Sequence, residues 1–238
     1  MEKKRLVAVN EMKTNVAAVA LFFVLFLAGT CLSQIVLKAK AVALGKVYWD
    51  VILAVGMVAV GVMAHEGLHG LCAMLFGKAK KEDLKIGFSR KRGLFYCHCK
   101  KDVSVGAYRV MLIVPIVVTG IIPFVVCLFV GGLPLSAAFA MLTAGGMGDL
   151  AMLWNTRKET KNAMIRDHED RMAFYAVYKE GEEPEGFTET TEEEEQKTLS
   201  AVDKKGAESM GVKIVLIALF LALTALALYV LALVLKFV

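Results

Sequence analysis

Long apolar segments separated by charged ones dominate the pattern of this chain. Five of them meet the requirement of about twenty residues for crossing a bilayer, at roughly 16–37, 50–77, 110–130, 134–155 and 212–235. Hydrophobic residues make up 57% of the chain and the mean hydropathy is +0.59, which exceeds the usual apolar share of a soluble domain. The pattern predicts an all-α membrane protein with about five transmembrane helices.

The polar segments divide the chain further. Leu84, Ile86 and Phe88 alternate with polar or small residues, and a Gly-containing turn and a second extended run follow, which predicts a small cytoplasmic β-hairpin after the second span. We expect residues 172–178 to fold back onto the membrane domain. The expected parts are an N-terminal lead (1–15) with a possible interfacial helix, a membrane-embedded core (16–155), a charged segment with a flexible acidic linker (156–211) and a C-terminal anchor (212–238).

The distribution of positive charge predicts the orientation in the membrane. Of the 28 Lys and Arg residues, all but Lys38, Lys40, Lys46 and Lys236 fall on the side that holds the N-terminus. Because positive residues gather on the cytoplasmic side, we expect the N-terminus in the cytoplasm and the C-terminus outside. The net charge of +5 follows from this topology, and no nucleic-acid motif accompanies it. We therefore expect a multi-pass protein of the cell membrane, in contact with the bilayer and not with nucleic acid.

The second apolar segment contains an H-E-x-x-H motif formed by His65, Glu66 and His69. Two histidines four residues apart lie on one face of a helix, so both imidazoles can bind a single zinc ion. Glu66 then lies where it can act as a general base on a water molecule. Ionisable side chains at membrane depth are costly and mark function. The motif predicts a hydrolase with Zn²⁺ as its cofactor.

The fourth apolar segment supplies a candidate for a third zinc ligand. Catalytic zinc usually has three protein ligands and one open position for water. The second and fourth segments both run toward the cytoplasm and carry their costly polar residues near that end, so Asp149 lies at the depth of the histidines. Glycines around Asp149 let a neighbouring helix come close. Cys72 shares the histidine face of its helix, and we interpret it as a packing residue.

Cys97, His98 and Cys99 are a second group of residue types that bind metals. Adjacent residues of a strand point to opposite faces, and no second Cys/His pair is nearby in the sequence, so we do not expect zinc there. A disulfide framework is not expected either, because their loop is placed in the reducing cytosol. For Asp167 and His168, a surface position and a supporting or alternative role at the site both remain open.

These motifs resemble the bacterial membrane proteins grouped as the putative zincin peptidase family. The resemblance covers roughly residues 50–178 and rests on the segments 65–70, 96–99, 148–150 and 167–168. That family is similar to the site-2 proteases, which are intramembrane zinc metalloproteases with an aspartate ligand on a later helix. The resemblance implies that His65, His69 and Asp149 bind zinc and that Glu66 is the general base. The Asn-Pro pair that usually precedes the aspartate in site-2 proteases is absent here.

The residues together predict a membrane-embedded zinc metalloendopeptidase that cleaves a membrane-associated protein or peptide near the cytoplasmic face. An extended substrate can pair with a hairpin edge, and we expect that edge at Leu84, Ile86 and Phe88. The alternative is a non-proteolytic scaffold that holds a metal or binds a partner with the same zincin-like core. A transporter with a buried His/Asp cluster is a third hypothesis, although no internal repeat accompanies the five spans. No oligomeric state is predicted.

Overall fold

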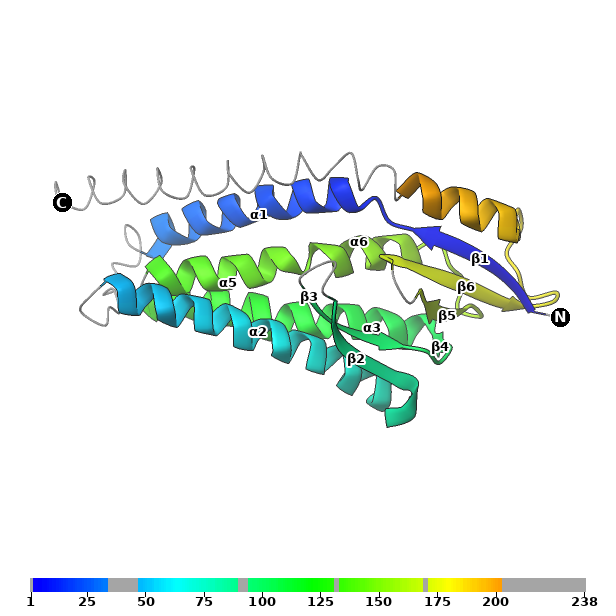
Figure 1. Ribbon diagram of the computed structural model, residues 1–238, viewed down its shortest axis with the longest axis horizontal. Helices are drawn as coiled ribbons and strands as arrows, with labels where there is room; N and C mark the ends of the chain where they lie inside the picture. Colours follow the sequence, from blue (N-terminus) through cyan, green and yellow to red (C-terminus); the bar gives the residue numbers. More distant parts are fainter. Residues whose placement is uncertain (1, 34–46, 90–93, 131–132, 169–170, 203–238) are drawn as a thin grey trace.

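Long helices form most of the structure, a computed structural model that describes residues 2–33, 47–89, 94–130, 133–168 and 171–202. The helices extend along the long axis of the molecule, and α2 packs against α3 and α5 while α1 packs against α5 (Figure 1). The labelled helices are α1 (Glu11–Cys31), α2 (Val47–Leu75), α3 (Val105–Pro115), α4 (Ile122–Val130), α5 (Leu133–Gly145) and α6 (Met147–Thr156), and residues 192–202 are helical as well. The strands are β1 (Glu2–Ala8), β2 (Leu84–Ser89), β3 (Leu94–Cys99), β4 (Val103–Ser104), β5 (Met164–Asp167) and β6 (Ala173–Lys179), and a short 3-10 turn, Lys81–Asp83, precedes β2.

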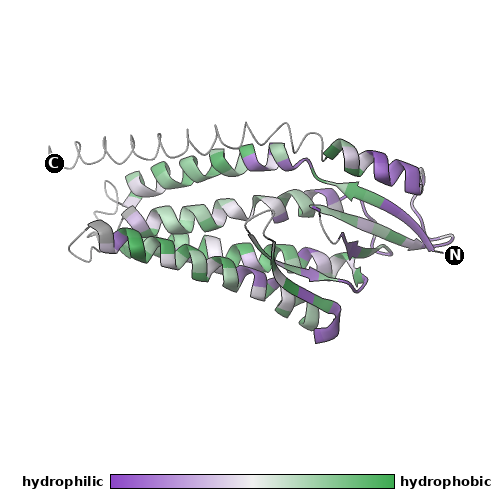
Figure 2. Cartoon of the chain, in the orientation of Figure 1, coloured by the Kyte–Doolittle hydropathy of each residue, from purple (hydrophilic) through white to green (hydrophobic). Residues whose placement is uncertain are grey.

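Four helical stretches of the described chain are long and apolar enough to cross a membrane. Hydrophobic residues cover them, while hydrophilic residues gather toward the end of the molecule that holds the N-terminal strand (Figure 2). The first stretch begins before the predicted residue 16, because the Asn10 side chain accepts a hydrogen bond from Lys13 N and caps the helix there. The fifth predicted span, 212–235, lies outside the described residues. The four stretches are Glu11–Cys31, Trp49–Leu75, Val105–Val130 and Pro134–Thr156.

The N-terminal segment is a strand, so the interfacial helix that we considered there is wrong. β1 pairs antiparallel with β6 from Glu2 opposite Lys179 to Ala8 opposite Ala173, in a four-stranded sheet with the order β1-β6-β5-β4. Aromatic and β-branched residues in β6 favour a strand. The all-α prediction omitted this sheet. Its paired strands β1 and β6 come from distant parts of the sequence, and no local pattern in either strand predicts the pairing.

The segment 172–178 packs into the membrane-proximal core as expected. Phe174 and Tyr178 of β6 are almost completely buried, in one cluster with residues of α2 and α3. The acidic segment, for which we expected a linker, contacts the sheet: Thr190 N donates to Lys4 O at 3.0 Å, and the ring of Phe187 lies 5.2 Å from that of Tyr178. These contacts join the sheet to the chain that follows it.

The predicted hairpin is present as strands β2 and β3. They pair antiparallel from Leu84 opposite Cys99 to Ser89 opposite Leu94. The hairpin crosses in front of α2 and α3 (Figure 1), and β3 contacts α2. The chain therefore places an open two-stranded sheet beside the second spanning helix.

The third spanning stretch changes its helical winding at Pro115. The π-helical segment η3 (Ile116–Ile121) follows this proline and leads into α4. Proline lacks an N–H and its ring crowds the preceding turn, which explains a local change of winding there. A wider turn of this kind is often found at functional sites.

Glycines bring η3 very close to α5 and to the start of α6. A Cβ atom added at Gly120 would lie 2.9 Å from Thr143 Cα, and one added at Gly146 would lie 2.7 Å from Ile116 Cγ1. Gly146 is also the N-cap of α6, so the helix restarts where the two elements meet. This close approach fixes the first turn of α6 against η3.

We predict that Gly120→Ala destabilises the fold by about 1–3 kcal/mol, the usual cost of overpacking. The new methyl group meets backbone atoms of α5, which cannot rotate away as a flexible side chain does. Gly56→Ala is the matched control, because nothing lies within 4 Å of a Cβ atom at this position in α2. The thermal unfolding midpoint of the detergent-solubilised protein should fall for Gly120→Ala alone. Equal midpoints for both variants would contradict the close packing.

Candidate metal centre

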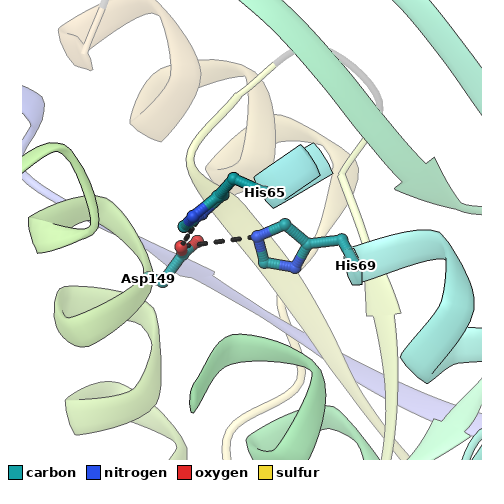
Figure 3. A group of neighbouring side chains, drawn as sticks. All are labelled: His65, His69 and Asp149. Carbon is teal, nitrogen blue, oxygen red and sulfur yellow. Dashed lines mark hydrogen bonds and ion pairs between the residues drawn. The ribbon is translucent and has the colours of Figure 1, made fainter. Parts of the chain in front are cut away.

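The two motif histidines lie on one face of α2 and are largely buried. Their side chains are 13% and 12% exposed for His65 and His69, and their ring centroids are 5.0 Å apart. The i, i+4 spacing on a helix places the two imidazoles one turn apart, as the sequence predicts. Both rings point to the same side of α2 (Figure 3).

Asp149 reaches the two histidines from α6. Its Oδ2 atom lies 2.9 Å from His65 Nε2 and 3.4 Å from His69 Nε2 (Figure 3). Asp149 belongs to the first turn of α6, directly after the break at Gly146. The restart of the helix therefore positions the carboxylate. In the described part of the chain, these three side chains form a group of metal-binding residue types whose donor atoms all lie within 4.8 Å of one another.

The donor set fits a catalytic zinc ion. Two imidazoles and one carboxylate are a common ligand set of catalytic zinc, which keeps a fourth position open. Ligand atoms bound at about 2.0–2.2 Å in a tetrahedron lie about 3.3–3.6 Å from each other. The distances from Asp149 Oδ2 to the two histidine nitrogens are close to this spacing, so the residues present fit such an ion.

Glu66 lies beside these ligands and faces a cavity. Its Oε2 atom accepts a hydrogen bond from the backbone N–H of Cys97 at 2.8 Å. The cavity has a volume of about 340 Å³, and His69, Asp149, Phe95 and Met172 also line it. A carboxylate next to the ligands and open to a cavity is placed to exchange a proton with a bound molecule.

One edge of the hairpin faces the metal centre, and it belongs to β3. The outward N–H of Cys97 reaches Glu66, and that of Cys99 lies 3.4 Å from Asp167 Oδ2. Alternate residues of a strand direct their N–H groups to the same edge. Phe95 therefore shares this edge with the two cysteines.

The residues that we expected at the substrate-binding edge lie on the other strand. Leu84, Ile86 and Phe88 belong to β2, and β3 separates the backbone of β2 from α2. Side chains of Leu84 and Ile86 come within 3.5 and 4.0 Å of a Cβ atom placed at Gly70, so they pack on α2. The hairpin edge that lies beside the site is therefore the edge of β3.

The remaining candidate residues lie around the cavity and not among the ligands. Burial, helped by the negative charges of Glu66 and Asp167, raises the pKa of the Cys97 thiol to about 12, which disfavours the thiolate that binds metals. Cys72 is buried in the core next to α3. His168 stacks on the ring of Tyr175 at 5.8 Å and also lines the cavity.

Asp167 is a partly buried acid on the cavity wall. It accepts a hydrogen bond from Tyr108 Oη at 2.7 Å, and its Oδ2 atom lies 3.9 Å from His98 Nδ1. Burial raises the pKa of Asp167, while these partners oppose the shift. The surface interpretation of Asp167 is therefore wrong, because β5 ends inside the core and directs this residue toward the cavity.

Thr119 also contacts the site, and no motif in the sequence predicts this contact. Its Oγ1 atom lies 3.1 Å from His65 Nδ1, on the side of the ring opposite Asp149. Thr119 belongs to η3 and is 7% exposed. The only signal in the sequence is a hydroxyl residue inside an apolar span, four residues after a proline.

Comparison with protein families supports a zincin-like relationship for the middle of the chain. A family model described as "Putative zincin peptidase" matches residues 58–164, a range that contains His65, Glu66, His69 and Asp149. Searches of curated proteins and of solved structures gave no match. The matched family suggests a metallopeptidase and implies zinc as the metal.

We predict that Asp149→Ala weakens zinc binding by at least about 100-fold, since even a partner one step removed from the metal contributes about 10–100-fold. The matched controls are Cys72→Ala and His168→Ala, which should retain the zinc content of the wild type. Zinc per purified chain, measured by mass spectrometry after dialysis against a chelator, tests this. Full occupancy in Asp149→Ala would remove Asp149 from the ligand set.

Proposed function

We propose that this protein is a membrane-embedded zinc metalloendopeptidase that hydrolyses a membrane-associated protein or peptide near the cytoplasmic face. The observation that carries the proposal is the convergence of His65, His69 and Asp149 beside a cavity that Glu66, His69 and Asp149 line. His65, His69 and Asp149 supply the ligand atoms, and Glu66 lies beside them. The match to a zincin-like family over the same residues supports the same chemistry.

The residues have separate roles in the proposed reaction. A zinc ion held by the three ligands would supply Lewis acidity, which polarises the scissile carbonyl and makes a water molecule more acidic. Glu66 accepts the proton from the attacking water and returns it to the leaving amine. The N–H of Cys97 holds one carboxylate oxygen of Glu66 at 2.8 Å and leaves the other oxygen for this proton transfer.

The proposed orientation in the membrane is supported by the distribution of charge and by the position of the site. The cavity reaches residues of β5 and the start of β6, two strands of the sheet on the hydrophilic side of the molecule (Figure 2). The positive-inside rule assigns that end to the cytoplasm. Water and an extended substrate can then enter the site from the cytoplasmic side.

The outer edge of β3 is the proposed binding site for the substrate backbone. The Cys97 N–H on this edge is bonded to Glu66, and Phe95 directs its own N–H to the same side of the hairpin, where it is the group proposed to pair with a peptide. A peptide that pairs with this edge runs beside the general base, and main-chain hydrogen bonds hold it with little dependence on its side chains. This geometry favours the β3 edge over the β2 edge.

We expect Glu66→Gln to lower kcat by about 10²–10⁴-fold, the usual contribution of general acid–base catalysis. Zinc content should stay at the wild-type level, since Glu66 is not a ligand. Metal analysis together with cleavage of a peptide that accumulates in cells carrying the variant measures both effects. Unchanged cleavage would exclude Glu66 as the base. Normal zinc content without cleavage of any substrate by the wild type would favour the metal-holding scaffold.

A pair of proline variants tests the edge. Phe95→Pro removes an N–H from the β3 edge and should raise KM relative to Phe95→Ala. Ile86→Pro removes the equivalent outward N–H from β2, because Ile86 lies opposite Cys97, and it should match Ile86→Ala. The reverse result would assign the substrate to the β2 edge.

A further inference from the structure

We propose that Thr119 is a positioning residue that fixes the proton and the ring orientation of His65 for metal binding. The inference rests on the metal centre of the proposed function. It concerns a residue of η3, which contributes no ligand to that centre.

The hydroxyl group of Thr119 has one proton, and the structure shows where it goes. Thr119 Oγ1 donates to Pro115 O at 2.8 Å. The same oxygen lies 3.1 Å from His65 Nδ1 and so must act as the acceptor of that second bond. His65 therefore carries a proton on Nδ1. Its Nε2 atom faces Asp149 Oδ2 at 2.9 Å, and a metal ion bound between these two atoms would take the place of the proton there.

The backbone around Thr119 holds the hydroxyl in place. Thr119 is nearly buried, and the next residue, Gly120, packs against the backbone of Thr143 with no room for a Cβ atom. Pro115 precedes the wider turn and offers a carbonyl for the Thr119 proton. The π-helical winding thus has a specific consequence at the site, which is to aim a hydroxyl acceptor at His65.

Thr143 provides a matched control on the neighbouring helix. Its Oγ1 atom donates to Phe139 O at 2.8 Å, the same bond to the fourth preceding residue that Thr119 makes. Its exposed fraction is 8%, against 7% for Thr119. Thr143 belongs to α5 and is not a partner of His65 in the described hydrogen bonds. Removal of either hydroxyl therefore breaks the same kind of bond within a helix. Only the loss of the Thr119 hydroxyl also removes a contact to His65.

The test measures the zinc dissociation constant of the full-length chain in detergent, by competition with a chromophoric chelator. Thr119→Val should weaken zinc binding by about 10–100-fold, the usual effect of losing the hydrogen-bond partner of a ligating histidine. Thr119→Ser keeps the hydroxyl and should bind zinc as the wild type does. Thr143→Val should also bind zinc as the wild type does.

Three outcomes would overturn the inference. They are wild-type affinity in Thr119→Val, an equal loss in Thr119→Val and Thr143→Val, and a failure of Thr119→Ser to restore binding. If Thr119→Val does not fold, Thr119→Ala and Thr119→Ser decide, because they differ in the hydroxyl alone and only Thr119→Ala should lose affinity. A wild-type chain that binds no zinc would instead contradict the metal centre itself, and the inference would fall with it.

Discussion

The contact between Asp149 and the two motif histidines is the interaction on which the rest of the structure depends. A carboxylate within an apolar helix bundle is costly unless opposite charge or a metal ion compensates it. Here Asp149 Oδ2 lies within 3.4 Å of both imidazoles, and the donor atoms of all three residues lie within 4.8 Å of one another, close enough to share one metal ion. The other helices of the bundle must therefore keep α2 and α6 in one fixed relative position.

The packing of the bundle meets this requirement through backbone contacts. Gly120 and Gly146 allow η3 to contact α5 and the first turn of α6. Asp149 belongs to this first turn. The same segment presents Thr119 to His65. One irregular turn after Pro115 thus connects helix packing to the orientation of the candidate ligand His65, and β3 connects the hairpin to Glu66, the proposed general base.

Local patterns in the sequence were sufficient to predict the hairpin and the grouping of His65, His69 and Asp149. Helical spacing predicted the shared face of His65 and His69, and depth in the membrane selected Asp149. Alternation predicted β2 and β3, but it could not say which edge meets α2, since that depends on tertiary packing. The pairing of β1 with β6 was not predicted either, because it too depends on tertiary packing. Thr119 has no motif, because its role arises only where η3 meets α2.

X-ray absorption at the zinc edge of the purified protein tests the central claim most directly. The account predicts that zinc has only nitrogen and oxygen neighbours at about 2.0–2.2 Å, with the outer-shell scattering of two imidazoles. Sulfur at about 2.3 Å would contradict it, because a thiolate among Cys72, Cys97 and Cys99 would then hold the metal in place of Asp149.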